Sequence, residues 1–155
     1  KQQLRTYLFK KFVKIEKKTV SKKELFNLID TVIISLEDQK FLNDKYYSDA
    51  KSKAFYRRGY SLNKIRFNLI KKGIDQKYIK DSISKIQEDE SDPDFFSAIK
   101  ICKKRRIGPI REESNRSLFY KKDISILARS GFSYDTSKKV LDLPKDEFLK
   151  FTKMI

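Results

Sequence analysis

The densest cluster of side chains that can bind an anion lies in the stretch YRRGYSLNKIRFNLIKKGI, residues 56–74. Its candidate binding residues are Arg57, Arg58, Tyr60, Lys64, Arg66, Lys71 and Lys72. A second basic cluster is formed by Lys103, Lys104, Arg105 and Arg106. An arginine grips a carboxylate or phosphate through two parallel hydrogen bonds, whereas a lysine attracts it as a point charge. The clusters therefore predict a surface for phosphate or for acidic protein, and a solvated helix face is the alternative interpretation.

Aromatic residues accompany the first cluster. They are Tyr46, Tyr47, Phe55, Tyr56 and Tyr60. Such rings can stack on the bases of single-stranded nucleic acid. Tyr47 fits an apolar stripe and is expected in the core, whereas Tyr56 and Tyr60 flank Arg57 to Gly59 and are expected to be exposed.

The charge of the whole chain favours the same kinds of partner. Lys and Arg number 37 against 21 Asp and Glu, which gives a formal net charge of +16. A surplus of this size attracts polyanions by long-range steering and by counterion release. An acidic protein groove would attract the chain equally well.

Residues for catalysis or metal binding are scarce. The chain has no histidine and a single cysteine, Cys102, so zinc-ligand spacings and an internal disulfide are excluded. The glycines form neither a phosphate-binding loop nor a dinucleotide fingerprint. Asp44, Asp75 and Asp92 are explained as helix caps. We predict no enzyme activity, no metal and no cofactor, with Cys102 packed in the interior.

The lone cysteine also favours a reducing setting, and we expect a cytoplasmic monomer. The longest aliphatic run, residues 32–34, is far shorter than the roughly 18 residues that span a bilayer. No signal-peptide pattern opens the sequence. We therefore expect no association with a membrane.

Helix-start signals recur along the sequence. Ser21 with Glu24 forms a capping box, and further N-caps are predicted at Asn43, Ser61, Asp75, Asp92 and Ser133. Two apolar stripes are predicted to be buried: Leu25, Ile29, Val32 and Leu36, then Tyr47, Ala50 and Ala54. Residues 107–113 are predicted to form a loop. No segment alternates with a period of two, so we predict an all-α fold.

An internal repeat organises these helices. Residues 69–74, LIKKGI, match residues 127–132, LARSGF, and residues 4–12 superpose similarly on residues 65–73. The predicted units are a first, truncated repeat at 1–42, a three-helix repeat at 43–90, and a third repeat plus a C-terminal helical turn at 91–155. Units this small must share their apolar faces with neighbours. We expect tandem three-helix repeats of right-handed helices in an elongated, curved array.

The order of these blocks resembles a known family. The segments FLNDKYYSDAKSKAFYRRGYSLNKIRFNLIKKGI, residues 41–74, and ILARSGFSYDTSKKVL, residues 126–141, are similar to the RecX regulators of bacterial recombination. The resemblance implies a non-catalytic protein of tandem three-helix units. It also implies binding in the groove of the RecA filament on DNA, with restraint of its ATPase, strand-exchange and coprotease activities. Direct DNA binding would then be weak.

A different class of function is a sequence-specific DNA-binding protein of the helix-turn-helix type. Residues 61–86 contain two helices joined by a glycine-containing turn, with Gln76 and Lys77 placed to read base edges. We rank this alternative lower because Ile74, Ile79 and Ile83 use much of the second helix for packing. A passive basic scaffold without preference among anions is a third hypothesis.

Overall fold

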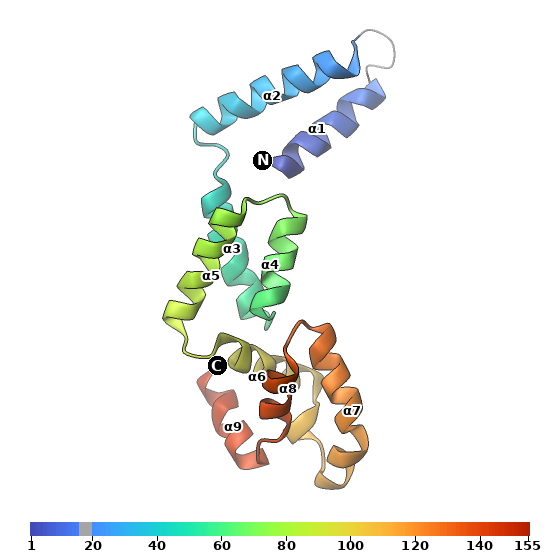
Figure 1. Ribbon diagram of the computed structural model, residues 1–155, viewed down its shortest axis with the longest axis vertical. Coiled ribbons are helices and arrows are strands. Elements are labelled where there is room, and N and C mark those ends of the chain that lie inside the picture. The colour runs from blue at the N-terminus through green and yellow to red at the C-terminus, as the bar shows by residue number, and fades with distance from the viewer. Residues whose placement is uncertain (16–19) are drawn as a thin grey trace.

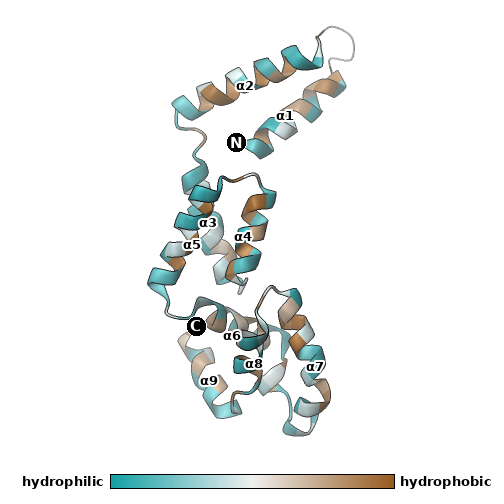
Figure 2. Ribbon diagram, in the orientation of Figure 1, coloured by the Kyte–Doolittle hydropathy of each residue, from teal (hydrophilic) through white to brown (hydrophobic). Residues whose placement is uncertain are grey.

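The computed structural model describes residues 1–15 and 20–155. Regular structure in these residues is entirely helical, which confirms the all-α prediction (Figure 1). The elements are α1 (Gln2–Ile15), α2 (Lys22–Asp38), α3 (Asp44–Arg57), α4 (Leu62–Lys71), α5 (Gln76–Asp89), α6 (Pro93–Arg105), the 3-10 turn η1 (Gly108–Ile110), α7 (Glu113–Arg129), α8 (Tyr134–Leu141) and α9 (Lys145–Met154). Hydrophobic and hydrophilic residues mix along the helices, as amphipathic packing requires (Figure 2).

The helices form three groups in succession along the long axis of the molecule (Figure 1). The first group, α1 and α2, buries Leu25, Ile29 and Ile33. The second, α3 to α5, buries Ile65, Leu69, Ile74, Ile79, Ile83 and Ile86. The third, α6 to α9, has a core that includes Phe95, Ile99, Cys102, Leu127, Val140 and Phe148. The repeat boundaries at 1–42, 43–90 and 91–155 stay a prediction, and residues 16–19 of the first repeat lie outside the described residues.

The predicted helix starts are confirmed. The Ser21 side chain accepts a hydrogen bond from the Glu24 N–H while the Glu24 carboxylate accepts from the Ser21 N–H, so the capping box is complete. The other predicted caps each accept from a backbone N–H two or three residues later: Asn43, Ser61, Asp75, Asp92 and Ser133. These signals are local, so they do not depend on what the helix packs against.

The predicted buried stripe of α2 is confirmed at Leu25 and Ile29 and wrong at Val32, and that of α3 is wrong at Ala50. On α2, Val32 is 50% exposed and Ile33 is buried instead. On α3, Ala50 is exposed, whereas Ser48 and Ser52 are fully buried. The Ser48 hydroxyl donates to the Tyr78 carbonyl and lies 2.8 Å from the Ser82 hydroxyl of α5. Small polar side chains paired in this way satisfy each other and let two helices approach closely.

A buried carboxylate fixes the loop after α6, which was predicted for residues 107–113 and contains η1. Asp123 of α7 is 1% exposed. One of its oxygens accepts from the Gly108 N–H at 2.9 Å and from Arg111 Nε at 2.8 Å, while the other accepts from Arg111 Nη2 at 2.8 Å. Gly108 has a positive φ of 64°, and a Cβ there would lie 2.5 Å from Leu141. The loop is therefore held between α7 and α8.

We expect Asp123→Asn to lower the free energy of unfolding by about 2 kcal/mol, because it weakens charge-assisted hydrogen bonds in a buried site. Urea unfolding followed by circular dichroism measures the change. Asp135→Asn, at an exposed position in the first turn of α8, is the matched control and should change stability by less than about 0.5 kcal/mol. Equal losses of unfolding free energy in both variants would show that the buried hydrogen bonds of Asp123 do not stabilise the loop.

Candidate interaction surface

The turn between α3 and α4 carries the paired arginines. Arg57 ends α3 and Arg58 is its C-cap, and both side chains are exposed. Gly59 follows with a positive φ of 82°, and a Cβ there would lie 3.2 Å from both the Ser97 carbonyl and Lys100 Cβ of α6. Glycine is favoured here because it accepts the left-handed conformation and leaves room for α6. The turn therefore packs against the third group of helices.

The start of α4 is bonded to two elements of that third group. The buried Ser61 hydroxyl accepts from the Lys64 N–H and donates to the Ser130 carbonyl at 3.1 Å. The Leu62 N–H donates to an Asp94 carboxylate oxygen at 2.7 Å. Burial raises the pKa of Asp94, and the hydrogen bond from Leu62 opposes that rise. We refer to these contacts of residues 58–64 with α6 and with the α7–α8 turn as the joint.

Gly131 completes the joint from the other side. Its φ is 90°, and a Cβ at this position would collide with the Ser61 hydroxyl and lie 3.2 Å from Lys64 Cβ. The glycine thus serves both the helix ending at Ser130 and the close approach of α4. The start of α4 and the α7–α8 turn are therefore held in close contact.

A pocket of about 480 Å³ opens beside the joint. It is lined by Arg58, Gly59, Tyr60, Lys64, Ile101, Lys104, Arg105 and Ser130. We call it the joint pocket. It brings cations from both predicted basic clusters together, although the clusters lie far apart in the sequence.

The cations of the joint pocket have no carboxylate partner among the described residues. The salt bridges there involve other basic residues: Lys1, Arg5, Lys85, Arg111, Arg116 and Lys139. No acidic residue lines the pocket. Its positive charge is therefore available to an anion, and low-dielectric walls of a cleft strengthen such attraction.

The two tyrosines expected to be exposed are both half-buried, so that prediction was wrong for each. Tyr60 stacks on Phe55 with ring centroids 5.2 Å apart, and Lys64 Nζ lies 4.9 Å from its ring centroid. Tyr56 is buried further at its polar end. Its hydroxyl is buried without a hydrogen-bond partner in the described residues, and burial raises its pKa to about 12.

The most exposed aromatic residues near a basic surface are Tyr46, which belongs to the predicted aromatic set, and Phe41, which lies outside it. Phe41 is 75% exposed and Tyr46 is 74% exposed. Both line a pocket of about 400 Å³ between the first two groups of helices, together with Tyr47 and Lys72. Phe41 carries no sequence signal for exposure, because its apolar side chain suits a core equally well.

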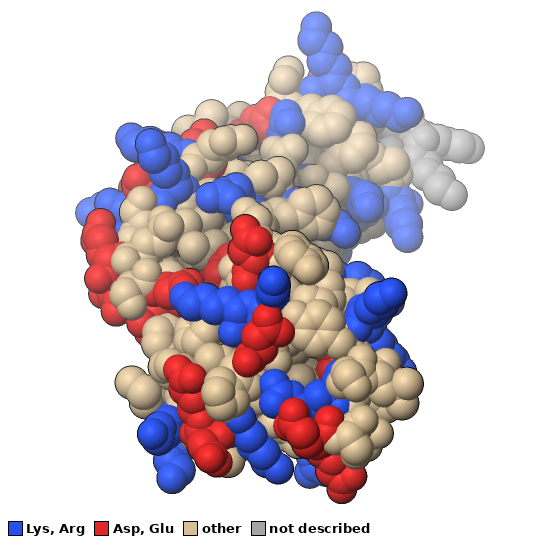
Figure 3. Space-filling model, turned by 60° about the horizontal axis from the view of Figure 1, so that its bottom comes forward, with Lys and Arg blue, Asp and Glu red and all other residues tan. Residues whose placement is uncertain are grey.

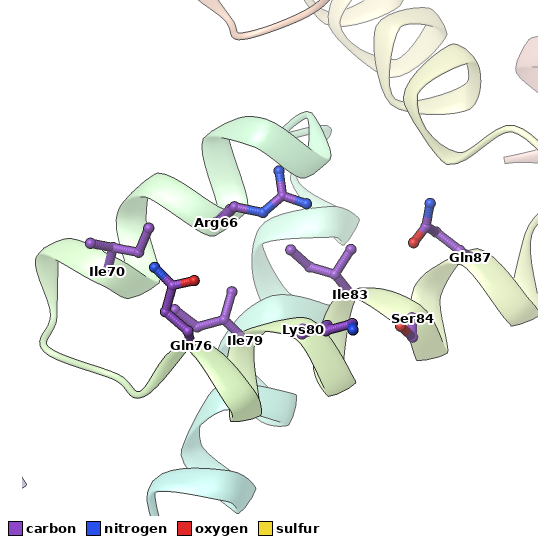
Figure 4. A pocket seen from close by; sticks show the side chains of 8 residues that line it. All are labelled: Arg66, Ile70, Gln76, Ile79, Lys80, Ile83, Ser84 and Gln87. Atoms are coloured by element: carbon purple, nitrogen blue, oxygen red, sulfur yellow. The ribbon is translucent and has the colours of Figure 1, made fainter.

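The remaining predicted basic residues lie apart from the joint pocket. Lys103 donates to the Thr152 carbonyl of α9, and Arg106 closes α6 in a left-handed conformation. Lys71 is exposed at the end of α4, and Arg57 lines none of the described pockets. Arg66 points into a separate groove between α4 and α5 (Figure 4). The eleven predicted residues therefore do not form one continuous site.

Charges of both signs mix over the end of the molecule formed by the third group. Figure 3 shows acidic and basic side chains interspersed on this face. The net charge is thus not spread evenly, and local clusters such as the joint pocket decide where an anion binds.

Other kinds of site find no support in the described residues. They contain no group of acidic, histidine or cysteine side chains placed to hold a metal ion. None of the described helices is both long and apolar enough to cross a bilayer.

Gln76, which the helix-turn-helix alternative expects to read base edges, lies in the α4–α5 groove. Ile79 and Ile83 of the same helix are 2% and 3% exposed.

Comparison with known proteins confirms the resemblance to the RecX family. The chain is 29% identical over 116 residues to the regulatory protein RecX of Myxococcus xanthus, covering 74% of this chain and 60% of that protein. It is 26% identical over 123 residues to the regulatory protein RecX of Clostridium perfringens strain SM101, covering 79% of this chain and 56% of that protein. The chain thus spans little more than half the length of these relatives. No family model and no solved structure matches it.

We expect Ser61→Ala to lower the free energy of unfolding by about 2 kcal/mol, because it removes a helix cap and leaves the buried Ser130 carbonyl unpaired. Ser133→Ala is the matched control, since Ser133 also caps a helix but is exposed and makes no bond to another group of helices. Its expected cost is about 1 kcal/mol. Urea unfolding of both variants gives the difference, and a cost for Ser133→Ala as large as for Ser61→Ala would contradict the joint.

The Cys102 thiol should be inert in the folded chain. It is fully buried, and burial together with the charge of Asp123 raises its pKa to about 12. Reaction requires the thiolate, so a thiol-reactive dye at pH 8 should label the native chain negligibly and the urea-unfolded chain fully. Rapid labelling of the native chain would show that the thiol is accessible.

Proposed function

We propose, from the similarity to RecX regulatory proteins, that this chain binds the RecA filament on DNA and restrains its ATPase, strand-exchange and coprotease activities. The observation that carries the proposal is the joint pocket, where Arg58, Lys64 and cations of α6 converge without a carboxylate partner. A recombinase filament on DNA offers both phosphate and acidic protein surface. The proposal includes a monomer acting in the cytoplasm.

The joint prepares this pocket for binding. Arg58 and Lys64 come from one group of helices, while Lys104 and Arg105 come from another. The Ser61 to Ser130 hydrogen bond and the Gly131 contact hold the two groups together. Cations held at a fixed spacing lose less freedom on binding, which raises affinity. The pocket is therefore suited to an anionic surface that presents charges at a matching spacing.

Binding alone accounts for the proposed regulation. The chain has no histidine, and its only cysteine is a buried thiol with a raised pKa. The remaining acidic side chains described above cap helices or pair with cations. A protein that occupies the filament surface blocks other substrates and fixes the filament conformation by differential binding.

The helix-turn-helix alternative retains one supporting observation. Gln76 and Lys77 are exposed at the start of α5, where a recognition helix would read bases. Selection from random duplex DNA tests it directly. Enrichment of one sequence motif would favour this alternative over filament binding.

Filament binding is tested by the ATP hydrolysis of RecA on single-stranded DNA. The wild-type chain should inhibit hydrolysis, and Arg58→Gln with Arg105→Gln should raise the half-inhibiting concentration about fivefold, or ~1 kcal/mol, as expected for truncated interfacial charges. Lys138→Gln with Lys145→Gln removes the same charge from exposed positions outside the joint pocket and should inhibit normally.

Circular dichroism should be the same for all of these variants, because both arginines are exposed. No inhibition by the wild-type chain at a several-fold excess over RecA would refute the proposed function. Equal weakening by the two double variants would instead assign the effect to net charge rather than to the joint pocket.

A further inference from the structure

A groove of about 360 Å³ lies between α4 and α5, on the second group of helices (Figure 4). Its apolar part is formed by Ile70, Ile79 and Ile83. Ile79 and Ile83 belong to the buried core, whereas Ile70 is 46% exposed and forms an open wall. Ile70 therefore supplies most of the aliphatic surface that the groove offers to a ligand side chain, and Ile79 and Ile83 form the floor. Its volume is at the lower end of the range for small-ligand pockets, so it suits one or two side chains.

The polar side chains that line the groove form a single hydrogen bond with other described residues. Arg66 Nη1 donates one hydrogen bond, to the Asn63 Oδ1 at 2.9 Å, and Arg66 forms no salt bridge within the described residues. The other polar side chains of the groove take part in no hydrogen bond or ion pair among those residues: Gln76, Lys80, Ser84 and Gln87. Two cations without a carboxylate partner and two side-chain amides without a hydrogen bond thus line the groove, and no acidic residue lines it.

The arrangement of these residues has a direction. Gln76 and Gln87 lie at the two ends of the row along α5, with the isoleucines between them and Arg66 reaching over from α4 (Figure 4). The eleven-residue separation corresponds to about 16 Å along a helix. An extended peptide of about five residues covers that length.

We propose that the α4–α5 groove binds a short acidic peptide segment that inserts one apolar side chain. The apolar side chain contacts Ile70, Ile79 and Ile83, and flanking carboxylates pair with Arg66 and Lys80. The amides of Gln76 and Gln87 bond the peptide backbone at either end. The inference rests on the proposed function in one respect, since it assigns this segment to the protein subunits of the filament.

The composition of the groove favours a peptide over nucleic acid. Single strands are held by aromatic rings that stack on bases, together with cations that follow the backbone. The α4–α5 groove has aliphatic walls and no aromatic lining residue. An isolated anion would pair with the two cations but leave the exposed side chain of Ile70 uncovered. Only a ligand that is acidic and apolar at once satisfies both parts.

The test is fluorescence anisotropy with the full chain and a labelled peptide of the sequence Glu-Asp-Leu-Asp-Glu. Replacement of the leucine by alanine should weaken binding several-fold, because it removes the side chain that fills the groove. Arg66→Gln and Lys80→Glu should each weaken binding of the leucine peptide about tenfold or more. Lys53→Glu, on an exposed position of α3 with no described contact, is the matched charge control and should bind as the wild type does.

Each contrary result overturns the inference. The first is equal binding of the leucine and alanine peptides. The second is a loss of binding in Lys53→Glu as large as that in Lys80→Glu. The third is that Arg66→Gln and Lys80→Glu weaken the binding of an oligothymidine but not that of the leucine peptide. All variants change exposed side chains, so their unfolding curves should match that of the wild type.

The inference and the proposed function fail in different ways. If the chain inhibits RecA but does not bind the leucine peptide through Arg66 and Lys80, only the inference about the groove is wrong. If the peptide binds as expected while RecA is unaffected, only the assignment to the filament is wrong, and the groove serves another acidic protein.

Discussion

The Ser61 hydroxyl holds together the two parts of the molecule that carry the basic clusters. It caps the start of α4 by accepting from the Lys64 N–H, and it binds the C-terminal end of α7 by donating to the Ser130 carbonyl. Both oxygens are buried, so water cannot replace this bond. Because one hydroxyl serves both helices, the start of α4 cannot move without opening the joint. Together with the Leu62 to Asp94 hydrogen bond, the Ser61 hydroxyl fixes how the cations on the two sides of the joint pocket face each other.

A second contact of the same kind lies between the first two groups of helices. Gly73, in the turn between α4 and α5, has a φ of 73°, and a Cβ there would lie 2.5 Å from Gln2 Cβ at the start of α1. Gly131, in the turn between α7 and α8, meets the start of α4 in the same way. In each case a helix begins against a glycine turn of the next group. This likeness supports tandem repeats, since each of the matched sequence blocks LIKKGI and LARSGF has its glycine at the fifth position.

The sequence predicted the features that depend on near neighbours in the chain. Caps such as Ser21 and Asn43 act over two or three residues, and their hydrogen bonds are present. The predictions for Val32 and Ala50 were wrong because α2 packs through Ile33 and α3 through small serines, and hydrophobicity alone does not favour Ser48 over Ala50. The joint pocket was also out of reach, since it needs Lys104 beside Arg58. Tyr56 was misplaced because a helix end on the surface of one group is covered by α6 of the next.

The close contacts at Gly73 and Gly131 also bear on the angle between neighbouring groups of helices. Each group of helices is rigid through its own core, so the angle between groups is decided in a few turn residues. A small change in backbone angle at Gly73 or Gly131 moves the far ends of the attached helices by a distance that grows with helix length. The angles between the three groups of helices therefore depend on two positions where only the hydrogen of a glycine fits. A bulkier residue at either point would push the neighbouring group away and change this angle, even with every cation left in place.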